Sequence, residues 1–122
     1  MFVMRAPGTR RYEMELLWEN ANPGSTFAAQ TIELELAAYD LCAVECLYNS
    51  SSSKMIMMQF SKIETGKGLY LNCASGNTGT DQSRGVNYVE GGLEINDAYR
   101  GGSKNNACMI PYRIFGIKGV EQ

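Results

Sequence analysis

The sequence of 122 residues contains no histidine. Histidine is the commonest general base near neutral pH and the commonest metal ligand. Serine is abundant, but no Gly-x-Ser-x-Gly motif is present, and there is no imidazole to activate a hydroxyl group. We therefore expect a protein that is not an enzyme, with no catalytic residue, no metal site and no cofactor.

Paired carboxylates are the remaining catalytic route, as in glycoside hydrolases. Glu33 and Glu35 alternate with Ile32 and Leu34, which is typical of the solvated face of a strand. The other acidic residues are scattered near the C-terminal part of the chain. The pattern favours a binding protein over a small hydrolase.

The chain also lacks long apolar runs and an excess of positive charge. No stretch approaches the ~20 apolar residues of a membrane-spanning helix. Arg5 and Pro7 interrupt the apolar N-terminus, so no signal-peptide core is expected. A net charge of −2 and a pI near 5.1 give no support for nucleic-acid binding. We expect no membrane or nucleic-acid partner, and a protein that stays in the cytoplasm or leaves it by a route other than signal-dependent export.

Four cysteines are present, but their spacing does not predict a disulfide. Cys42 and Cys46 lie four residues apart on a predicted strand, which separates their Cα atoms by ~13 Å. A disulfide needs ~4.4–6.8 Å. Without histidine, a zinc site would need all four cysteines, with Cys73 and Cys108 drawn from other strands. Buried free thiols are the simpler interpretation.

What the chain does contain is a repeated alternation of apolar and polar residues with the period of a β-strand. It predicts about eight strands: Tyr12–Trp18, Thr31–Leu36, Leu41–Tyr48, Lys54–Phe60, Gly68–Cys73, Val86–Glu90, Leu93–Tyr99 and Ala107–Ile117. Turn residues separate them every ~8–12 residues, and no long helical periodicity competes. We expect a basic arm over residues 1–11 and, over residues 12–122, a single antiparallel, jelly-roll-like β-sandwich with no major helix.

The alternation also predicts which faces of two of these strands are buried. Tyr12, Met14, Leu16 and Trp18 should share one buried face. The strand Leu41–Tyr48 is apolar on both sides and should be central and covered on both faces.

The turns and breaks are equally specific. Gly91-Gly92 is expected to form a hairpin turn. Pro111 within the last strand indicates an edge position or a bulge. The methionines Met55, Met57 and Met58 suggest adaptable packing, either in the core or under a subunit contact.

Three segments resemble a known family. They are LLWENANPGSTFAAQTIELELAAYD (Leu16–Asp40), GLEINDAYR (Gly92–Arg100) and IPYRIFGIKG (Ile110–Gly119). They resemble small phage and prophage structural proteins of Firmicutes, in particular a tail-fibre or receptor-binding tip module. The resemblance implies a virion-associated β-domain, a homotrimer in contact with other virion proteins, presented at the end of a fibre. The N-terminal arm, the serine loop after Tyr48 and the loop Ala74–Arg84 depart from the family pattern.

Two polar loops could recognise a glycan. Ala74–Arg84 and Arg100–Asn106 flank the predicted hairpin Val86–Tyr99, so they should lie at the same end of the domain, where loops commonly build a site. The candidate ligand-binding residues are Asn77, Asp81, Arg84, Tyr99, Arg100 and Asn105. Turns also favour Gly, Asn and Asp for backbone reasons alone. Trp18 fits a core position better than a sugar-stacking one.

We therefore expect a phage virion protein that contacts host cell-surface polysaccharide. One alternative is a capsid decoration or head-fibre protein, with the basic arm as its anchor. The other is a carbohydrate-binding module or small hydrolase that acts outside any virion.

Overall fold

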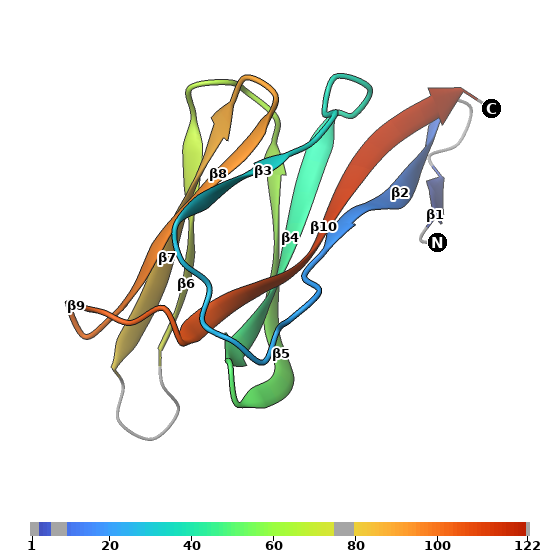
Figure 1. Ribbon diagram of the computed structural model, residues 1–122. Coiled ribbons are helices and arrows are strands. Elements are labelled where there is room, and N and C mark those ends of the chain that lie inside the picture. The colour runs from blue at the N-terminus through green and yellow to red at the C-terminus, as the bar shows by residue number, and fades with distance from the viewer. Residues whose placement is uncertain (1–2, 6–9, 75–79, 122) are drawn as a thin grey trace.

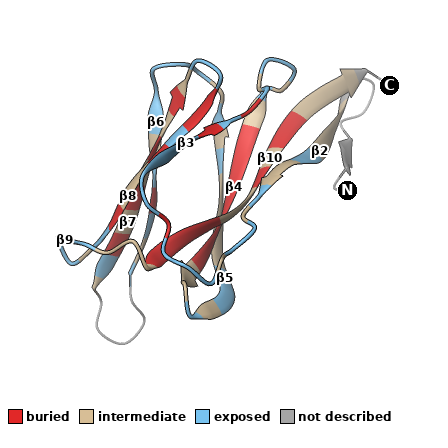
Figure 2. Ribbon diagram, viewed as in Figure 1, coloured by how far each residue is buried: buried red, intermediate tan, exposed pale blue. Residues whose placement is uncertain are grey.

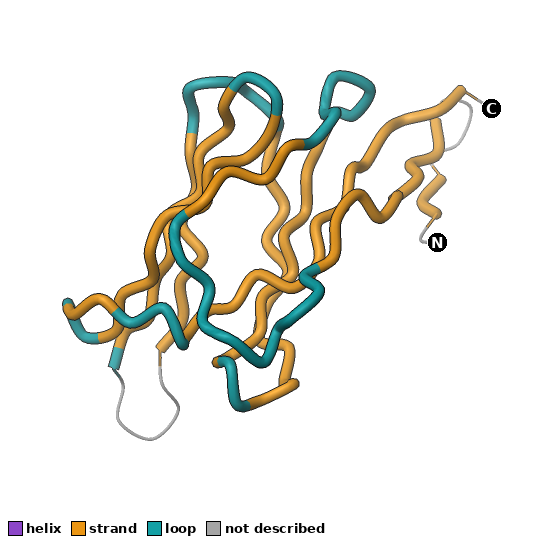
Figure 3. The backbone as a smooth tube through the Cα atoms, in the orientation of Figure 1, coloured by secondary structure: helices purple, strands orange, loops and turns teal. Residues whose placement is uncertain are grey.

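The computed structural model describes residues 3–5, 10–74 and 80–121. All of its regular structure is β-strand, arranged as two antiparallel sheets that pack face to face (Figures 1 and 3). The prediction of an antiparallel β-sandwich is confirmed. Among the described residues, no helix is long and apolar enough to cross a membrane.

Sheet A has the strand order β1-β2-β10-β4-β5, and sheet B has the order β3-β8-β7-β6, with β9 paired to β8. The strands of sheet A are β1 (Val3–Arg5), β2 (Arg10–Glu19), β10 (Cys108–Glu121), β4 (Leu41–Asn49) and β5 (Ser52–Lys62). Those of sheet B are β3 (Gln30–Glu33), β8 (Gly92–Arg100), β7 (Asp81–Val89), β6 (Gly68–Ala74) and β9 (Ser103–Lys104).

The short strands β1 and β9 were not predicted, and β1 lies in the expected N-terminal arm. Successive hairpins β4–β5 and β6–β7–β8 make up the middle of the chain.

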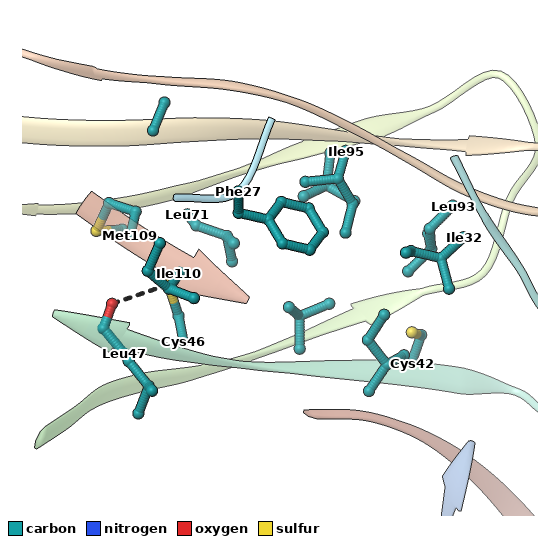
Figure 4. Close-up of a cluster of buried hydrophobic side chains, with 14 of the residues drawn as sticks. Phe27, Ile32, Cys42, Cys46, Leu47, Leu71, Leu93, Ile95, Met109 and Ile110 are labelled. Carbon is teal, nitrogen blue, oxygen red and sulfur yellow. Dashed lines mark hydrogen bonds between the residues drawn. The ribbon is translucent and has the colours of Figure 1, made fainter. Parts of the chain in front are cut away.

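The hydrophobic core lies between the two sheets (Figures 2 and 4). Phe27 enters it from the loop before β3, and Trp18 packs edge-on against that ring with 6.1 Å between the centroids. The core position expected for Trp18 is thus confirmed. Strand β4 is internal to sheet A and buried on both faces, as its double-sided apolar pattern predicts.

The expected single buried face of the first strand is wrong. In β2, Trp18 pairs with Ile114 and Leu16 pairs with Phe115, so Leu17 forms a bulge. A bulge reverses which side chains face inward. Trp18 therefore points into the core, whereas Leu16 lies on the outer surface with 51% of its area exposed.

Two turn and bulge expectations need correction. Pro111 lies in the internal strand β10, so the edge alternative is wrong; a register shift next to it shows the bulge. The hairpin turn consists of Glu90 and Gly91, with φ 85° at Gly91. Gly92 already belongs to β8, where a Cβ would lie 2.0 Å from the carbonyl oxygen of Ile32. Glycine is needed there because β3 passes so close.

The segment Ala74–Arg84 is not all loop. Strand β7 begins at Asp81, and Gln82 and Arg84 alternate inward with Ser83 outward. Gln82 and Arg84 are polar, which disguises the strand in the sequence, but both are fully buried.

Arg84 is the most unusual residue of the core. Its Nε donates to the Met109 carbonyl at 2.8 Å, and Nη1 donates to the carbonyls of Phe27 (2.9 Å) and Asn96 (2.8 Å). Nη2 donates to the Cys108 carbonyl at 3.2 Å. Burial lowers the pKa of the guanidinium, but Arg84 keeps its charge because arginine ionises far above neutral pH. It thus joins β7, β8, β10 and the loop before β3.

We expect Arg84→Ala to lower the free energy of unfolding by at least about 3 kcal/mol, because several buried carbonyls lose their donor. Urea denaturation followed by tryptophan fluorescence measures this. Lys67→Ala, on an exposed side chain, is the control and should change stability by less than about 0.5 kcal/mol. Equal effects of the two changes would contradict the role of Arg84.

The four cysteines are free thiols, and Cys42, Cys46 and Cys108 are buried. Burial raises the pKa of Cys42 to about 11 and that of Cys46 to about 12, from 9.0. At neutral pH both are therefore protonated and shielded. The expectation of buried free thiols is confirmed for these three, while Cys73 is partly exposed.

These raised pKa values predict a loss of stability in alkali. Above pH ~9 the unfolded chain releases thiol protons that the folded chain still holds, so the free energy of unfolding falls as pH rises from about 9 towards 12. Denaturation midpoints at pH 8 and pH 10 measure the decline. The double variant Cys42→Ala/Cys46→Ala should decline less steeply. A parallel decline in both proteins would contradict this.

Candidate functional site

Three of the candidate residues meet at one end of sheet B. Asp81 begins β7, and Tyr99 and Arg100 end β8. The carbonyl of Asp81 accepts a hydrogen bond from the Gly101 N–H at 2.9 Å, which closes this end of the β7–β8 hairpin. The predicted convergence therefore holds for these residues.

The other candidates behave differently. Asn105 is occupied by local structure, because its side-chain oxygen accepts the Ala107 N–H at 3.0 Å. Arg84 is not a surface residue, since the core described above encloses it completely. Asn77 lies outside the described residues.

A β-bulge decides which way Tyr99 points. Val86 pairs with Ile95 and Arg84 pairs with Ala98, so Gly85 alone lies opposite Asn96 and Asp97. Strict alternation from the buried Leu93 and Ile95 would turn Tyr99 into the core. The extra residue shifts the phase, and Tyr99 stands on the outer face of sheet B with 45% of its area exposed.

Hydrogen bonds hold this bulge in place. The Asp97 carboxylate accepts the Ala29 N–H at 3.1 Å and the Asn106 amide at 2.8 Å. The Asn106 side-chain oxygen accepts the Ala98 N–H at 2.7 Å. The pKa of Asp97 is lowered, chiefly by the bond from Asn106 and then by that from Ala29. The carboxylate is therefore ionised, and it ties the bulge to the start of β3.

A second tyrosine lies on the same outer face. Tyr70 of β6 pairs with Gly85 and is the most exposed large apolar side chain of the described residues, at 71%. Its ring leans over Gly85: a Cβ on Gly85 would lie 3.5 Å from the ring and 3.0 Å from the Asn96 amide nitrogen. Because Gly85 has no side chain, the ring and the amide both lie close against the strand and form a low floor at the centre of this face.

We call this surface the tyrosine face. It comprises Tyr70 and Asn72 of β6, Ser83 and Gly85 of β7, and Asn96 and Tyr99 of β8. Among the described residues of sheet B, Tyr70 and Tyr99 are the only large apolar side chains that are exposed. Aromatic rings can cover the apolar side of a sugar, while amides and hydroxyls both donate and accept hydrogen bonds. The arrangement can bind a polar ligand that has apolar sides.

Of the residues in the tyrosine face, the sequence analysis proposed only Tyr99. Tyr70 could have been found, because it alternates with the core residues Leu69 and Leu71 and so must face outward. Asn96 and Gly85 could not, since their roles follow from the bulge and from the close approach of the Tyr70 ring.

Two hollows on other parts of the surface are less suited to a ligand. One, of about 370 Å³, is lined by Pro23, Gly24, Leu47, Ser50–Ser53 and Tyr112. Its hydroxyls are partly committed, because Ser51 donates to Asn49 and Ser52 accepts from the Lys54 N–H. The other is an open groove of about 540 Å³ beside Glu33, Glu35 and Glu90.

Within the described part of the chain, no group of three or more His, Cys, Asp or Glu side chains could hold a metal ion. No protein-family model, no curated protein and no solved structure matches the chain.

We expect Tyr70→Ala and Tyr99→Ala to change the free energy of unfolding by less than about 0.5 kcal/mol each, because exposed side chains contribute little to stability. Thermal and urea unfolding of both variants measure this. A loss of more than about 2 kcal/mol in either variant would show that the tyrosine supports the fold, and that it is not free for a ligand.

Proposed function

We propose that this chain is a structural protein of a bacteriophage virion, a tail-fibre or receptor-binding tip domain, and that its tyrosine face contacts host cell-surface glycan. The resemblance of Leu16–Asp40, Gly92–Arg100 and Ile110–Gly119 to phage tip modules supports the virion role. The observation that carries the binding role is the pair of exposed tyrosines on an otherwise polar sheet face.

The proposal predicts binding without turnover. Purified protein should bind cell-wall polysaccharide of a suitable host, and the polysaccharide should be recovered unchanged. Tyr70→Ala and Tyr99→Ala should each weaken binding by about tenfold, the loss expected when one stacked aromatic ring worth ~1.4 kcal/mol is removed. A glycan array and isothermal titration calorimetry measure these effects.

Met55→Ala is the control, because it also removes an exposed apolar side chain, but from sheet A and outside the apolar row described below. It should bind glycan as the unchanged protein does. The proposal fails if no glycan on a broad array binds, or if all three variants bind equally well.

The outer face of sheet A has the opposite character, and we propose that it joins copies of this chain. Its central row runs across four strands, because Leu16 pairs with Phe115, Phe115 with Ala43, and Ala43 with Phe60. Leu16 and Phe60 are each 51% exposed. We call this row, together with the flanking Met58, the apolar face.

Charges on the apolar face fit a second copy. Beside the row, the Arg113 guanidinium bonds the Glu45 carboxylate at 2.9 Å and lies over the Phe115 ring, so the centre is neutral. Lys62 and Glu19 lie at opposite corners, by their pairing with Leu41 and Arg113. An identical face therefore offers apolar contacts and a charge of opposite sign at each corner.

The association predicts that Phe60→Glu yields monomers, because it places a charge at one of the two most exposed side chains of the apolar row. Light scattering at micromolar concentration measures the mass and distinguishes two chains from the three that the resemblance implies. Tyr70→Glu, on the other sheet, should leave the mass unchanged. A monomer of 13.5 kDa for the unchanged protein would contradict the association.

A carbohydrate-binding module that acts outside a virion is the second candidate, because the tyrosine face would serve it equally well. Immunogold electron microscopy of particles from a phage that encodes the chain separates the two functions. Label at the tail tip supports the main proposal, label on the head supports a decoration protein, and unlabelled particles support the separate module.

A further inference from the structure

We infer that the tyrosine face binds an extended, neutral, β-1,4-linked glycan that lies diagonally across β6, β7 and β8. This inference rests on the proposed glycan-binding function and specifies its ligand. It follows from the spacing of the two tyrosines, from the floor between them and from the charges at the rim.

The spacing requires a chain longer than a disaccharide. Tyr70 and Tyr99 lie on the two strands that flank β7, beside Gly85 and Ser83 respectively. With strands ~4.8 Å apart and a rise of ~3.3 Å per residue, their Cα atoms are about 12 Å apart. One sugar covers one ring, so a ligand that reaches both rings needs a further sugar between the two that stack.

The floor selects a flat ligand. Gly85 carries no side chain, and the Tyr70 ring and the Asn96 amide converge over it. Ser83 lies on the same strand, directly beside Tyr99. A β-1,4-linked chain is an extended ribbon in which every second sugar presents the same side, so its first and third sugars can stack while the middle sugar meets the amide and the hydroxyl.

The charges at the rim select a neutral ligand. Lys104, which pairs with Tyr99, lies 3.6 Å from the Asp97 carboxylate, so its charge is compensated. The Asn87 amide donates to Glu94 at 3.2 Å, which leaves an acidic group near the other end. The six residues of the tyrosine face are all uncharged, so an anionic polysaccharide would meet the Glu94 carboxylate without a cation of that face to offset it.

The experiment titrates the protein with cello- and chito-oligosaccharides from the monosaccharide to the hexasaccharide, and with oligogalacturonides as anionic probes. We expect affinity to rise by at least about tenfold between the disaccharide and the trisaccharide or tetrasaccharide, and then to level off. Tyr70→Ala and Tyr99→Ala should each abolish that rise, whereas Tyr70→Phe and Tyr99→Phe, which keep the ring, should retain it.

Several outcomes would overturn the inference. They are equal affinity for the disaccharide and the hexasaccharide, tighter binding of the anionic probes, and no binding of either neutral series. If the neutral series do not bind but host polysaccharide binds through the tyrosines, the proposed function stands and only the ligand class is wrong. If no glycan of any kind binds, both fail.

Discussion

The rest of this structure depends on the hydrogen bonds that the buried guanidinium of Arg84 donates to backbone carbonyls. A guanidinium buried without a carboxylate partner is costly unless its donors are satisfied. Here four carbonyls from three separate segments satisfy them, and the Phe27 ring lies 5.4 Å from the guanidinium. One of those carbonyls belongs to Met109, whose φ of 51° is unfavourable for a residue other than glycine. The hydrogen bond to Arg84 helps to offset that cost.

The same arginine connects the core to the candidate site. It lies on β7 between Ser83 and Gly85, which belong to the tyrosine face, and it binds the carbonyl of Asn96 from below. The side-chain amide of Asn96 lies on the other side, above Gly85. Arg84 was predicted to touch a ligand directly. Its place in the structure gives it a structural role instead, because it holds the backbone of the bulge beneath the tyrosine face.

The outer faces of the two sheets differ in the kind of side chain that they expose. Sheet A exposes Leu16 and Phe60 at the two ends of an apolar row, with the Arg113–Glu45 ion pair beside its centre, which suits contact with protein. Sheet B exposes two tyrosines among amides and hydroxyls, which suits a polar ligand with apolar sides. Such a division fits a domain that assembles through one sheet and recognises through the other. Both surfaces are built on strands, and rigid elements hold side chains more accurately than loops do.

Alternation with a period of two predicted the strands, the burial of Ile32 and Leu34 and the burial of β4 on both faces, although β3 already ends at Glu33. The predicted hairpin Val86–Tyr99, with a polar loop on either side, also indicated that Asp81 and Arg100 lie at the same end of the domain. It could not locate the bulges at Leu17 and Gly85, because each depends on pairing with a strand distant in sequence or on hydrogen bonds from another loop.

The sequence by itself determined the β class, the internal position of β4 and the burial of three of the four thiols, because each follows from hydrophobic periodicity along one segment. Only the tertiary structure decided that Leu16 and Tyr99 face solvent and that Arg84 does not. One extra residue in a strand reverses its phase. Whether a buried charge is tolerated depends on carbonyls that come together only when the two sheets pack.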